Sequence, residues 1–348
     1  MKKLISLMLS FSITSSLAAN VVACGTNFNV KISSDVSYYT LSVGNGLFSY
    51  LQVENKAILF DAGVGLQDGA SWTGELQKGN QFQSDFMKST GVEEIEAIFI
   101  THNHSDHYGN LDAITKNFKV NNIVMPYNYS SLQKRFVNDK EKSNIGDSKI
   151  FVDQNTNIVE EYKKSYQYLG IKFENWSYTA KEYMKSTLSN ESDENNRSSI
   201  LYASINDHAL LITGDAEENI GKEVMKNRDL RKVETLQVPH HGSGNMLSAN
   251  FVKNLDPTYC YVSGTNAKNS EWKDYANSLQ FPTYSGYTKI RTCNEIYLTG
   301  TYLDDSGYSD DFTDEFDQFE GSFEYQIKTD GSTALNYYEQ TIINPIFE

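Results

Sequence analysis

Short apolar runs rich in β-branched and aromatic residues recur along most of the chain, separated by mixed and polar segments. Their length and composition are typical of strands. The predicted strands are residues 38–43, 48–53, 57–60, 97–101, 122–125, 199–205, 209–213, 235–238 and 259–262. Helices are predicted between them, over residues 109–116, 130–137, 217–227, 247–254 and 270–279.

Strands that alternate with helices favour a layered α/β architecture. Asn206-Asp207 lies between two predicted strands and fits a hairpin turn. Residues 323–327 and 334–338 flank Asp330-Gly331-Ser332 and predict a closing hairpin. Two polar stretches predict surface loops, residues 138–149 and 189–197.

The 348 residues suffice for one large α/β domain or two ordinary ones, and the formal net charge is −15. This charge opposes tight non-specific binding of nucleic acid, which needs Lys and Arg facing the phosphates. Eight acidic residues gather in one segment: Asp304, Asp305, Asp310, Asp311, Asp314, Glu315, Asp317 and Glu320. The segment predicts a solvated insertion near residues 303–322, and its spacing fits no EF-hand. Without these eight residues the charge is −7, which leaves room for a neutral or basic groove elsewhere.

The N-terminal residues resemble the signal of a bacterial lipoprotein. Met1-Lys2-Lys3 is positive, residues 4–19 are apolar but too short and too rich in serine for a strong membrane span, and Cys24 follows. The resemblance implies four parts: a signal peptide over residues 1–23, a lipid on Cys24, a tether over residues 24–36 and a folded domain over residues 37–348. It places the protein at the extracellular face of the cell membrane. The alternative is an ordinary secretory signal in which Cys24 is incidental.

Cys260 and Cys293 are the cysteines that the mature chain keeps besides Cys24. A disulfide is permitted outside the cell. Cys260 lies in an apolar strand, however, where a cysteine usually serves as a small hydrophobic residue. We therefore expect two unpaired cysteines with a structural role.

Five of the six histidines lie in two short blocks, residues 101–107 (Thr-His-Asn-His-Ser-Asp-His) and residues 239–243 (Pro-His-His-Gly-Ser). Three histidines and one aspartate within six residues form a dense set of metal ligands. The first block follows an apolar strand, so its side chains are held at a strand end and face a cleft. His102 and His104 point the same way in extended backbone, whereas Asp106 lies past the turn. One block can therefore serve two adjacent metals.

The unbroken series His102, His104, Asp106 and His107 matches the signature His-x-His-x-Asp-His, and the chain resembles the metallo-β-lactamase superfamily in it. The family's further landmarks follow in order: Asp61 at the end of an early strand, Asp215 in a Thr-Gly-Asp motif, and the block at residues 239–243. The resemblance covers about residues 37–340. It implies an α/β protein with the four-layer αββα sandwich of that superfamily.

The resemblance is strongest to the branch of the ComEC-type competence nuclease domain, and secreted phosphorylcholine esterases are similar. The shared segments are residues 43–46 (Val-Gly-Asn-Gly) and the Asn-x-x-Ser of residues 196–199. Both kinds of relative cleave phosphodiesters. One departure is that lactamases and glyoxalases carry a further histidine about twenty residues before the bridging aspartate, where this chain offers Asn195 or Asn196. The spare His208 is expected to be exposed rather than a ligand.

The resemblance implies two ligand sets: site one with His102, His104 and Asp215, and site two with Asp106, His107, Asp215 and either His240 or His241. Site one is one protein ligand short. Asp61 would support a ligand rather than bind metal itself. The implied cofactor is Zn²⁺, one or two ions per chain, and Mn²⁺ is the alternative for a site with fewer histidines.

The implied chemistry is hydrolysis by a water molecule that a metal activates. The expected catalytic residues are Asp106, His240 and His241. Whichever of the two histidines is not a ligand would protonate the leaving oxygen. Ser243 and Asn45 would hold the phosphate by hydrogen bonds.

These features predict a surface-anchored, metal-dependent hydrolase that cleaves phosphodiesters, either as a nuclease or on small molecules. The predicted membrane contact is the lipid on Cys24, and no protein partner is predicted. One alternative is a metallo-hydrolase of carbon esters, amides or lactams, which the missing histidine disfavours. The other is a non-catalytic surface lipoprotein that binds a ligand through a vestigial site, which the near-complete ligand set disfavours.

Overall fold

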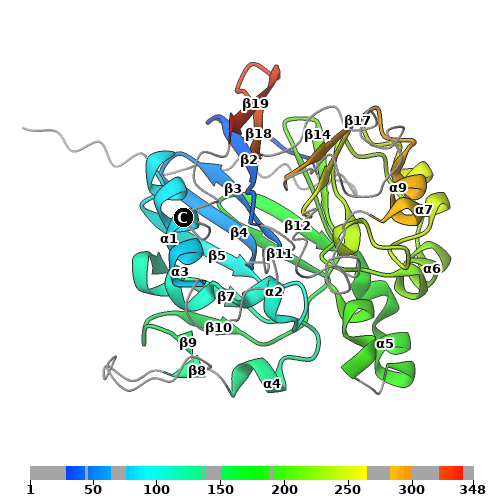
Figure 1. Cartoon of the computed structure of the whole chain (residues 1–348), viewed down its shortest axis with the longest axis horizontal. Helices are drawn as coiled ribbons and strands as arrows, with labels where there is room; N and C mark the ends of the chain where they lie inside the picture. The colour runs from blue at the N-terminus through cyan, green and yellow to red at the C-terminus, as the bar shows by residue number, and fades with distance from the viewer. Residues whose placement is uncertain are drawn as a thin grey trace, which may run out of the picture.

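The computed structural model describes eight parts of the chain, residues 29–43, 46–63, 76–134, 136–137, 150–188, 191–264, 283–299 and 321–339. Within these parts, two sheets pack face to face and helices cover their outer faces (Figure 1). Several predictions lie outside the described residues: the signal peptide with Cys24, Asn45, the loop 138–149, the helix 270–279 and the acidic segment 304–320.

One sheet has nine strands among the described residues, in the order β10–β7–β5–β4–β3–β2–β18–β19, with β6 paired to β5. Its strands are β2 (Val36–Thr40), β3 (Phe48–Val53), β4 (Lys56–Ala62), β5 (Glu94–Phe99), β6 (Lys119–Val120), β7 (Asn122–Val124), β10 (Asn157–Val159), β18 (Gly321–Ile327) and β19 (Thr333–Glu339). Strands β4, β5, β7 and β10 are parallel, and the remaining main strands extend the sheet in antiparallel pairs.

The other sheet has eight described strands, in the order β11–β12–β13–β14–β15–β16–β17, with β1 paired to β13. Its strands are β1 (Asn29–Val30), β11 (Ser165–Tyr168), β12 (Ile171–Asn175), β13 (Leu201–Ile205), β14 (His208–Ile212), β15 (Thr235–Gln237), β16 (Tyr259–Val262) and β17 (Glu295–Leu298). Strands β14 to β17 run parallel. A separate short pair joins β8 (Phe136–Val137) to β9 (Ile150–Phe151).

Helices form the two outer layers. The nine-stranded sheet is covered by α1 (Leu76–Ser89) and α3 (Leu111–Asn117), and the eight-stranded sheet by α5 (Lys181–Thr187), α6 (Glu218–Asn227), α7 (Ala249–Leu255) and α9 (Tyr284–Ile290). Shorter turns of helix are α2 (Ser105–Tyr108), α4 (Ser130–Gln133), η1 (Trp176–Ala180), η2 (Glu191–Arg197) and η3 (Pro239–Gly242). No helix in the described part of the chain combines the length and apolar composition needed to cross a bilayer.

Three buried apolar clusters correspond to the three interfaces between the four layers. Alternation along each strand divides its side chains between two of them. In β4, Ile58 and Phe60 face the other sheet, whereas Leu59 faces the helices. In β14, Ile212 lies between the sheets and Leu211 packs under the outer helices. Strands buried on both faces explain why the sequence shows continuous apolar runs.

Most predicted elements are confirmed. Every predicted strand overlaps an observed one, and the hairpin turn at Asn206-Asp207, the closing hairpin and the helices α6 and α7 are present. The helix predicted over 109–116 begins only at Leu111, after the separate turn α2. The helix predicted over 130–137 is wrong beyond residue 133, because Phe136 and Val137 pair with a strand distant in sequence.

The surface loop predicted over residues 189–197 is also wrong in part. Residues 191–197 form η2, in which Glu194 and Arg197 are buried and form an ion pair. Arg197 also donates to the carbonyl of Leu188 at 2.7 Å. The polar composition suggested solvent, but a buried charge is tolerated when it is paired and hydrogen-bonded. This pairing fixes η2 beside the histidine loop, where Glu194 accepts a hydrogen bond from the Asn103 amide.

The prediction of two unpaired cysteines is wrong, because Cys260 and Cys293 form a disulfide. Their Cα atoms lie 6.1 Å apart, within the usual range for a disulfide. Cys260 is on β16, and Cys293 comes two residues before β17, which pairs directly with β16. A separation of 33 residues hides this proximity in the sequence. The crossover through α9 creates it.

Candidate metal centre

Four chain segments meet at one edge of the two packed sheets. Asp61 lies near the end of β4, the histidine loop follows β5, Asp215 follows β14, and η3 follows β15. Because β4 is parallel to β5 and β14 to β15, the carboxyl ends of each pair share an edge. The loops approach closely at Gly214, where a Cβ would lie 2.4 Å from the hydroxyl of Thr101. The edge therefore gathers side chains that are far apart in sequence.

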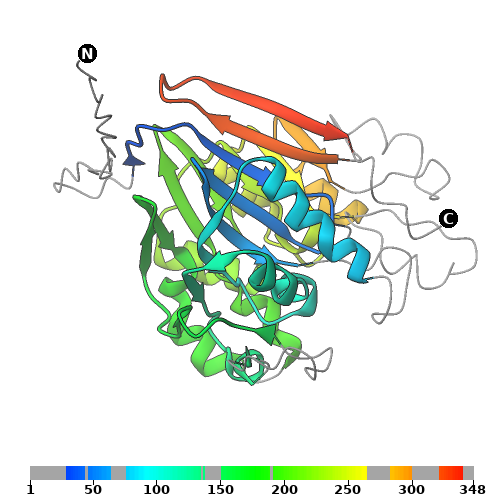
Figure 2. The ribbon, with the colours of Figure 1, turned by 90° about the vertical axis from the view of Figure 1, so that its left-hand side faces the viewer.

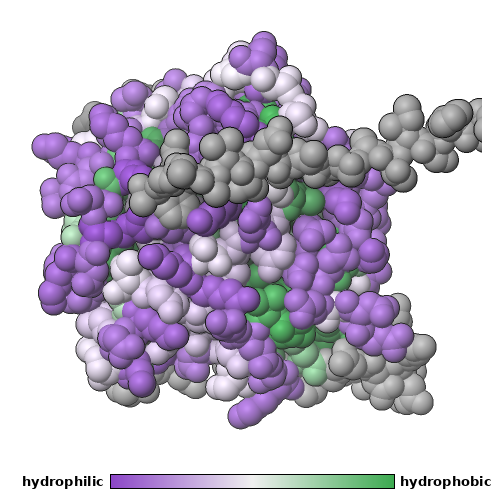
Figure 3. Space-filling view, turned by 180° about the vertical axis from the view of Figure 1, so that it is seen from behind, coloured by the Kyte–Doolittle hydropathy of each residue, from purple (hydrophilic) through white to green (hydrophobic). Residues whose placement is uncertain are grey.

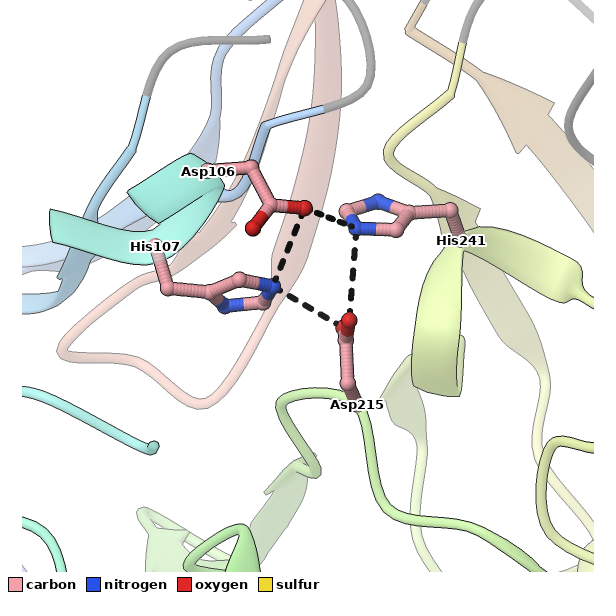
Figure 4. Close-up of side chains that lie close together, drawn as sticks. All are labelled: Asp106, His107, Asp215 and His241. Atoms are coloured by element: carbon pink, nitrogen blue, oxygen red, sulfur yellow. Dashed lines mark ion pairs between the residues drawn. The ribbon is translucent and has the colours of Figure 1, made fainter. Parts of the chain in front are cut away.

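The first group of candidate ligands consists of Asp106, His107, Asp215 and His241 (Figure 4). His107 Nε2 lies 3.0 Å from Asp215 Oδ1 and 3.9 Å from Asp106 Oδ2. His241 Nε2 lies 3.4 Å from Asp106 Oδ2 and 3.5 Å from Asp215 Oδ2. Asp106 comes from α2 and is 34% exposed, whereas the other three side chains are buried. The group is therefore closed on three sides and open beside Asp106.

The second group consists of His102, His104 and Asp215. His102 Nε2 lies 3.0 Å from His104 Nδ1 and 3.9 Å from Asp215 Oδ2. His102 is buried, and His104 is half-buried. Asp215 thus belongs to both groups, so two ions at these positions would share its carboxylate.

Asp61 holds His107 from behind. Its carboxylate lies 2.8 Å from His107 Nδ1 and accepts hydrogen bonds at 2.7 Å from the amide and the hydroxyl of Thr101. The side chain is fully buried, and its backbone has a φ of 61°. Since the carboxylate occupies Nδ1, the Nε2 of His107 is directed at the other members of the first group. This is the carboxylate–histidine support that many metal centres use.

The carbonyl of Ser263 supports His241 in the same way. His241 Nδ1 donates to this oxygen at 2.6 Å. A carbonyl can only accept, so Nδ1 carries a proton and Nε2 is the nitrogen directed at the centre. His240, His241 and Gly242 all have positive φ values, of 47°, 53° and 76°. Non-glycine residues in this conformation are strained, and such strain is concentrated at functional sites.

The geometry of the first group fits a metal ion. In a tetrahedral zinc site with bonds of about 2.0–2.2 Å, neighbouring ligand atoms lie about 3.3–3.6 Å apart. The four nitrogen-to-oxygen separations here run from 3.0 to 3.9 Å, and all four ligand atoms lie within 4.8 Å of one another. His107 Nε2 and Asp215 Oδ1 are buried and lie 3.0 Å apart, but neither has a hydrogen bond of good geometry. Buried polar atoms without hydrogen bonds are costly, and coordination would satisfy them. Two imidazoles and two carboxylates are also a donor set that suits Zn²⁺.

The carboxylates of the centre change the pKa values of its histidines. Burial favours the neutral form of His107, but the neighbouring carboxylates, that of Asp215 foremost, outweigh it and raise the pKa of this imidazole well above its usual range. The same competition raises the pKa of His241 to about 10. Burial lowers the pKa of His102 well below its usual range, and the charge on His107 adds to this effect. A divalent cation would replace the protons of His107 and His241.

His240 belongs to neither group in the part of the chain that the structure describes. Its Nδ1 lies 3.4 Å from Glu217 Oε1, and its Nε2 lies 3.2 Å from the amide nitrogen of Asn195 and 3.9 Å from Asp215 Oδ2. Glu217 also accepts from the amides of Asn195 and Asn196, at 3.1 and 2.9 Å. Burial alone would raise the pKa of Glu217. The interaction with His240, followed by the hydrogen bonds from the two asparagines, outweighs burial and keeps this pKa below its usual value. His240 is thus oriented beside the two groups rather than within them.

Other predicted residues lie elsewhere. Asn195 and Asn196, which stand where relatives carry a histidine, are committed to Glu217 rather than to the second group. The Ser243 hydroxyl donates to the side-chain oxygen of Asn245. His208 is half-buried, not exposed as expected, and pairs with Glu234 at the other end of β14. Sequence reasoning had no role for Glu217, although it follows Asp215 by only two residues.

Comparison with known proteins gives the family. The model of the metallo-beta-lactamase superfamily matches residues 42–264. The chain belongs to this superfamily. The match confirms the resemblance drawn from the motifs and accords with the αββα layers described above. The superfamily consists mostly of metal-dependent hydrolases, and its fold typically binds one or two divalent metals.

The curated proteins similar to this chain include proteins of bacterial competence. The chain is 24% identical over 233 residues to ComE operon protein 3 of Bacillus subtilis, covering 66% of this chain and 28% of that protein. It is 22% identical over 250 residues to Competence protein ComA of Neisseria gonorrhoeae, covering 71% and 28%. The chain therefore spans little more than a quarter of each of these relatives. Among solved structures, the metallo-beta-lactamase fold protein YhfI of Bacillus subtilis is 8% identical, with a TM-score of 0.39 and coverage of 71% and 93%.

Proposed function

We propose that this superfamily member is a metal-dependent phosphodiesterase that acts outside the cell. The observation that carries the proposal is the pair of donor groups joined through Asp215. Two metals a few ångströms apart are the usual arrangement for in-line displacement at phosphorus. The similarity to proteins named for competence supports a phosphodiester substrate, either nucleic acid or a small molecule.

The first group would hold one ion through Asp106, His107, Asp215 and His241, and the second group would hold another through His102, His104 and Asp215. Zn²⁺ suits these mixed histidine and carboxylate donors, and Mn²⁺ is the alternative. Such ions, when bound, activate water and offset charge on phosphoryl oxygens. The second group lacks a fourth protein donor among the described residues, which leaves space for a substrate oxygen. A lactamase-type reaction would use a second group with all of its protein donors. The missing donor therefore favours phosphodiesters as substrates.

His240 is the candidate proton donor. It is 19% exposed, lies beside the shared Asp215, and is backed by the Glu217 carboxylate. A histidine held by a carboxylate on one nitrogen can pass a proton to a leaving oxygen from the other. The sequence left the roles of these two histidines open. In this proposal His241 is the metal ligand and His240 is the proton donor.

We also propose that the protein is held at the extracellular face of the membrane by a lipid on Cys24. The disulfide between Cys260 and Cys293 supports export, since disulfides persist in oxidising compartments. Incorporation of labelled palmitate, lost in Cys24→Ser, is the expected result. Palmitate incorporation that persists in Cys24→Ser, or none in the unaltered protein, would overturn this part of the proposal.

Hydrolysis of bis(4-nitrophenyl) phosphate by the Cys24→Ser protein tests the activity. We expect turnover with Zn²⁺ or Mn²⁺, loss of turnover on chelation, and loss in His104→Ala. The matched control is His208→Asn, a histidine at the far end of the strand that leads to Asp215, which should keep the activity. Faster turnover of a lactam or thioester would instead favour carbon-centred hydrolysis. Protein purified without chelator that contains no metal would favour a binding role.

A further inference from the structure

The chain enters the domain at the end opposite the metal centre. β1 pairs with the last residues of β13, so that Asn29 lies beside Ser204 and Val30 beside Ile205. Ile205 in turn faces His208, where β14 begins its course towards Asp215. Seven residues of nearly extended chain lead from His208 to Asp215. The attachment of β1 therefore lies roughly 20 Å from the metal centre. In Figure 2, β1 and the turn between β18 and β19 lie at the left, whereas α9, which contacts η3, lies at the right.

The attachment of this segment is specific. The amide of Ile32 donates to the Asn206 side chain at 2.9 Å, and the Asn206 side chain donates back to the Ile32 carbonyl at 3.2 Å. The Asn206 amide donates to the carbonyl of Val30 at 2.8 Å. Lys31 forms an ion pair with Asp207. Asn206 is buried, so this is a built contact rather than a loose strand end.

Two turns of the nine-stranded sheet contact the residues that follow β1. Ser34 donates to Glu54 at 2.8 Å in the turn between β3 and β4, and the amide of Thr329 donates to Asp35 at 2.8 Å in the turn between β18 and β19. The side chains at these turns are polar or charged and mostly exposed. The face that contains this end is mostly hydrophilic (Figure 3), with apolar side chains gathered mainly low in that view. Such a surface can rest against lipid headgroups without inserting between acyl chains.

We propose that this end of the domain faces the bilayer and that the metal centre faces away from it. The inference rests on the proposed lipid anchor and phosphodiesterase function. Four residues separate Cys24 from Asn29, and the five Cα steps between them span at most about 18 Å. The docked β1 therefore keeps the anchored end near the headgroups and the centre roughly 20 Å further out. The substrates are phosphodiesters that approach from the medium, not the headgroups of the membrane that holds the protein.

Single engineered cysteines can report this orientation, since Cys24 would carry the lipid and Cys260 and Cys293 form a disulfide. Thr329→Cys places a fluorophore at an exposed turn near β1, and Ala249→Cys places one at the exposed start of α7, just after η3. The lipidated full chain is reconstituted into vesicles that contain nitroxide-headgroup lipid. We expect several-fold stronger quenching at position 329 than at position 249. Equal quenching, or stronger quenching at position 249, would overturn the proposal.

A second measurement uses phosphatidylcholine in the same vesicles beside soluble bis(4-nitrophenyl) phosphate. We expect turnover of the soluble diester and no headgroup release, whereas headgroup release by the unaltered protein would contradict the proposal. Asn206→Ala, checked for folding by near-ultraviolet circular dichroism, should loosen β1 and reduce the quenching contrast. If the protein hydrolyses neither diester, the phosphodiesterase proposal fails. The quenching measurement still tests the orientation, because it does not depend on activity. Absence of lipid on Cys24 overturns the orientation and leaves the hydrolysis of the soluble diester intact.

Discussion

At the residue scale, His107 and His241 are each held by an oxygen beside Nδ1, so that Nε2 faces the centre. His102, His104, Asp106 and His107 stand in one motif whose spacing already suggested two adjacent positions. His240 and His241 could not be distinguished, because adjacent residues in a left-handed backbone take directions that no strand or helix period predicts. Their supports, the Ser263 carbonyl and the Glu217 carboxylate, depend on tertiary contacts and carry no local signal.

The support of His107 by Asp61 leads to a prediction about metal affinity. Asp61→Asn keeps the size of the side chain but removes the charge that accepts from His107 Nδ1. Loss of such a partner weakens metal binding by about 10- to 100-fold. Zn²⁺ titration against a competing chelator should measure this loss, with His208→Asn unchanged as the control. An unchanged affinity in Asp61→Asn would mean that His107 is not a ligand.

Proton release gives a second residue-scale prediction. The pKa of His107 is raised well above its usual range, and that of His241 is raised to about 10. Without a metal, both imidazoles are therefore protonated on both nitrogens at neutral pH. A ligand imidazole must be deprotonated, so metal binding releases protons and tightens as the pH rises from about 6 to about 9. Calorimetry of Zn²⁺ binding in buffers of different ionisation enthalpy should show the release. Heats that do not depend on the buffer would contradict this assignment.

At the scale of elements, the strands were predictable and several helices were not. Strands such as β4 and β14 are buried on both faces, so their apolar runs are continuous and easily recognised. α1 and α5 have few apolar residues in their sequences, and packing against the sheets provides most of the stability of such helices. η2 looked like a solvated loop because its buried charges pair only in the folded chain. The position of the ligands at strand ends was predictable, since parallel strands present their carboxyl ends together.

The disulfide gives a prediction at this scale. It links residues 33 apart, on β16 and just before β17. Closing a loop of that length restricts the unfolded chain and stabilises the fold by about 3–4 kcal/mol. The double variant Cys260→Ala, Cys293→Ala should therefore unfold at lower urea concentration, with the metal centre still formed in the folded protein. Two free thiols in protein isolated from the cell exterior would contradict the pairing.

At the scale of the whole molecule, the four layers separate the metal centre from the point where the N-terminal segment is attached. The centre lies at the carboxyl ends of β4, β5, β14 and β15, and β1 is bound at the opposite end of β13. The fold class was predictable because the motifs identify the superfamily. The place of β1 was not predictable, because two residues of strand carry no readable pattern. The proposed orientation, with the metal centre facing away from the membrane, depends on the position of β1.

The carboxylate of Asp215 belongs to both donor groups, so its removal should disable both. The decisive measurement is the rate of bis(4-nitrophenyl) phosphate hydrolysis by metal-loaded Asp215→Asn beside metal-loaded and chelated wild-type protein. We expect the rate of Asp215→Asn to fall to that of the chelated wild type while its circular dichroism stays unchanged. Hydrolysis by the folded variant at the metal-loaded wild-type rate would contradict a metal-dependent centre built on Asp215.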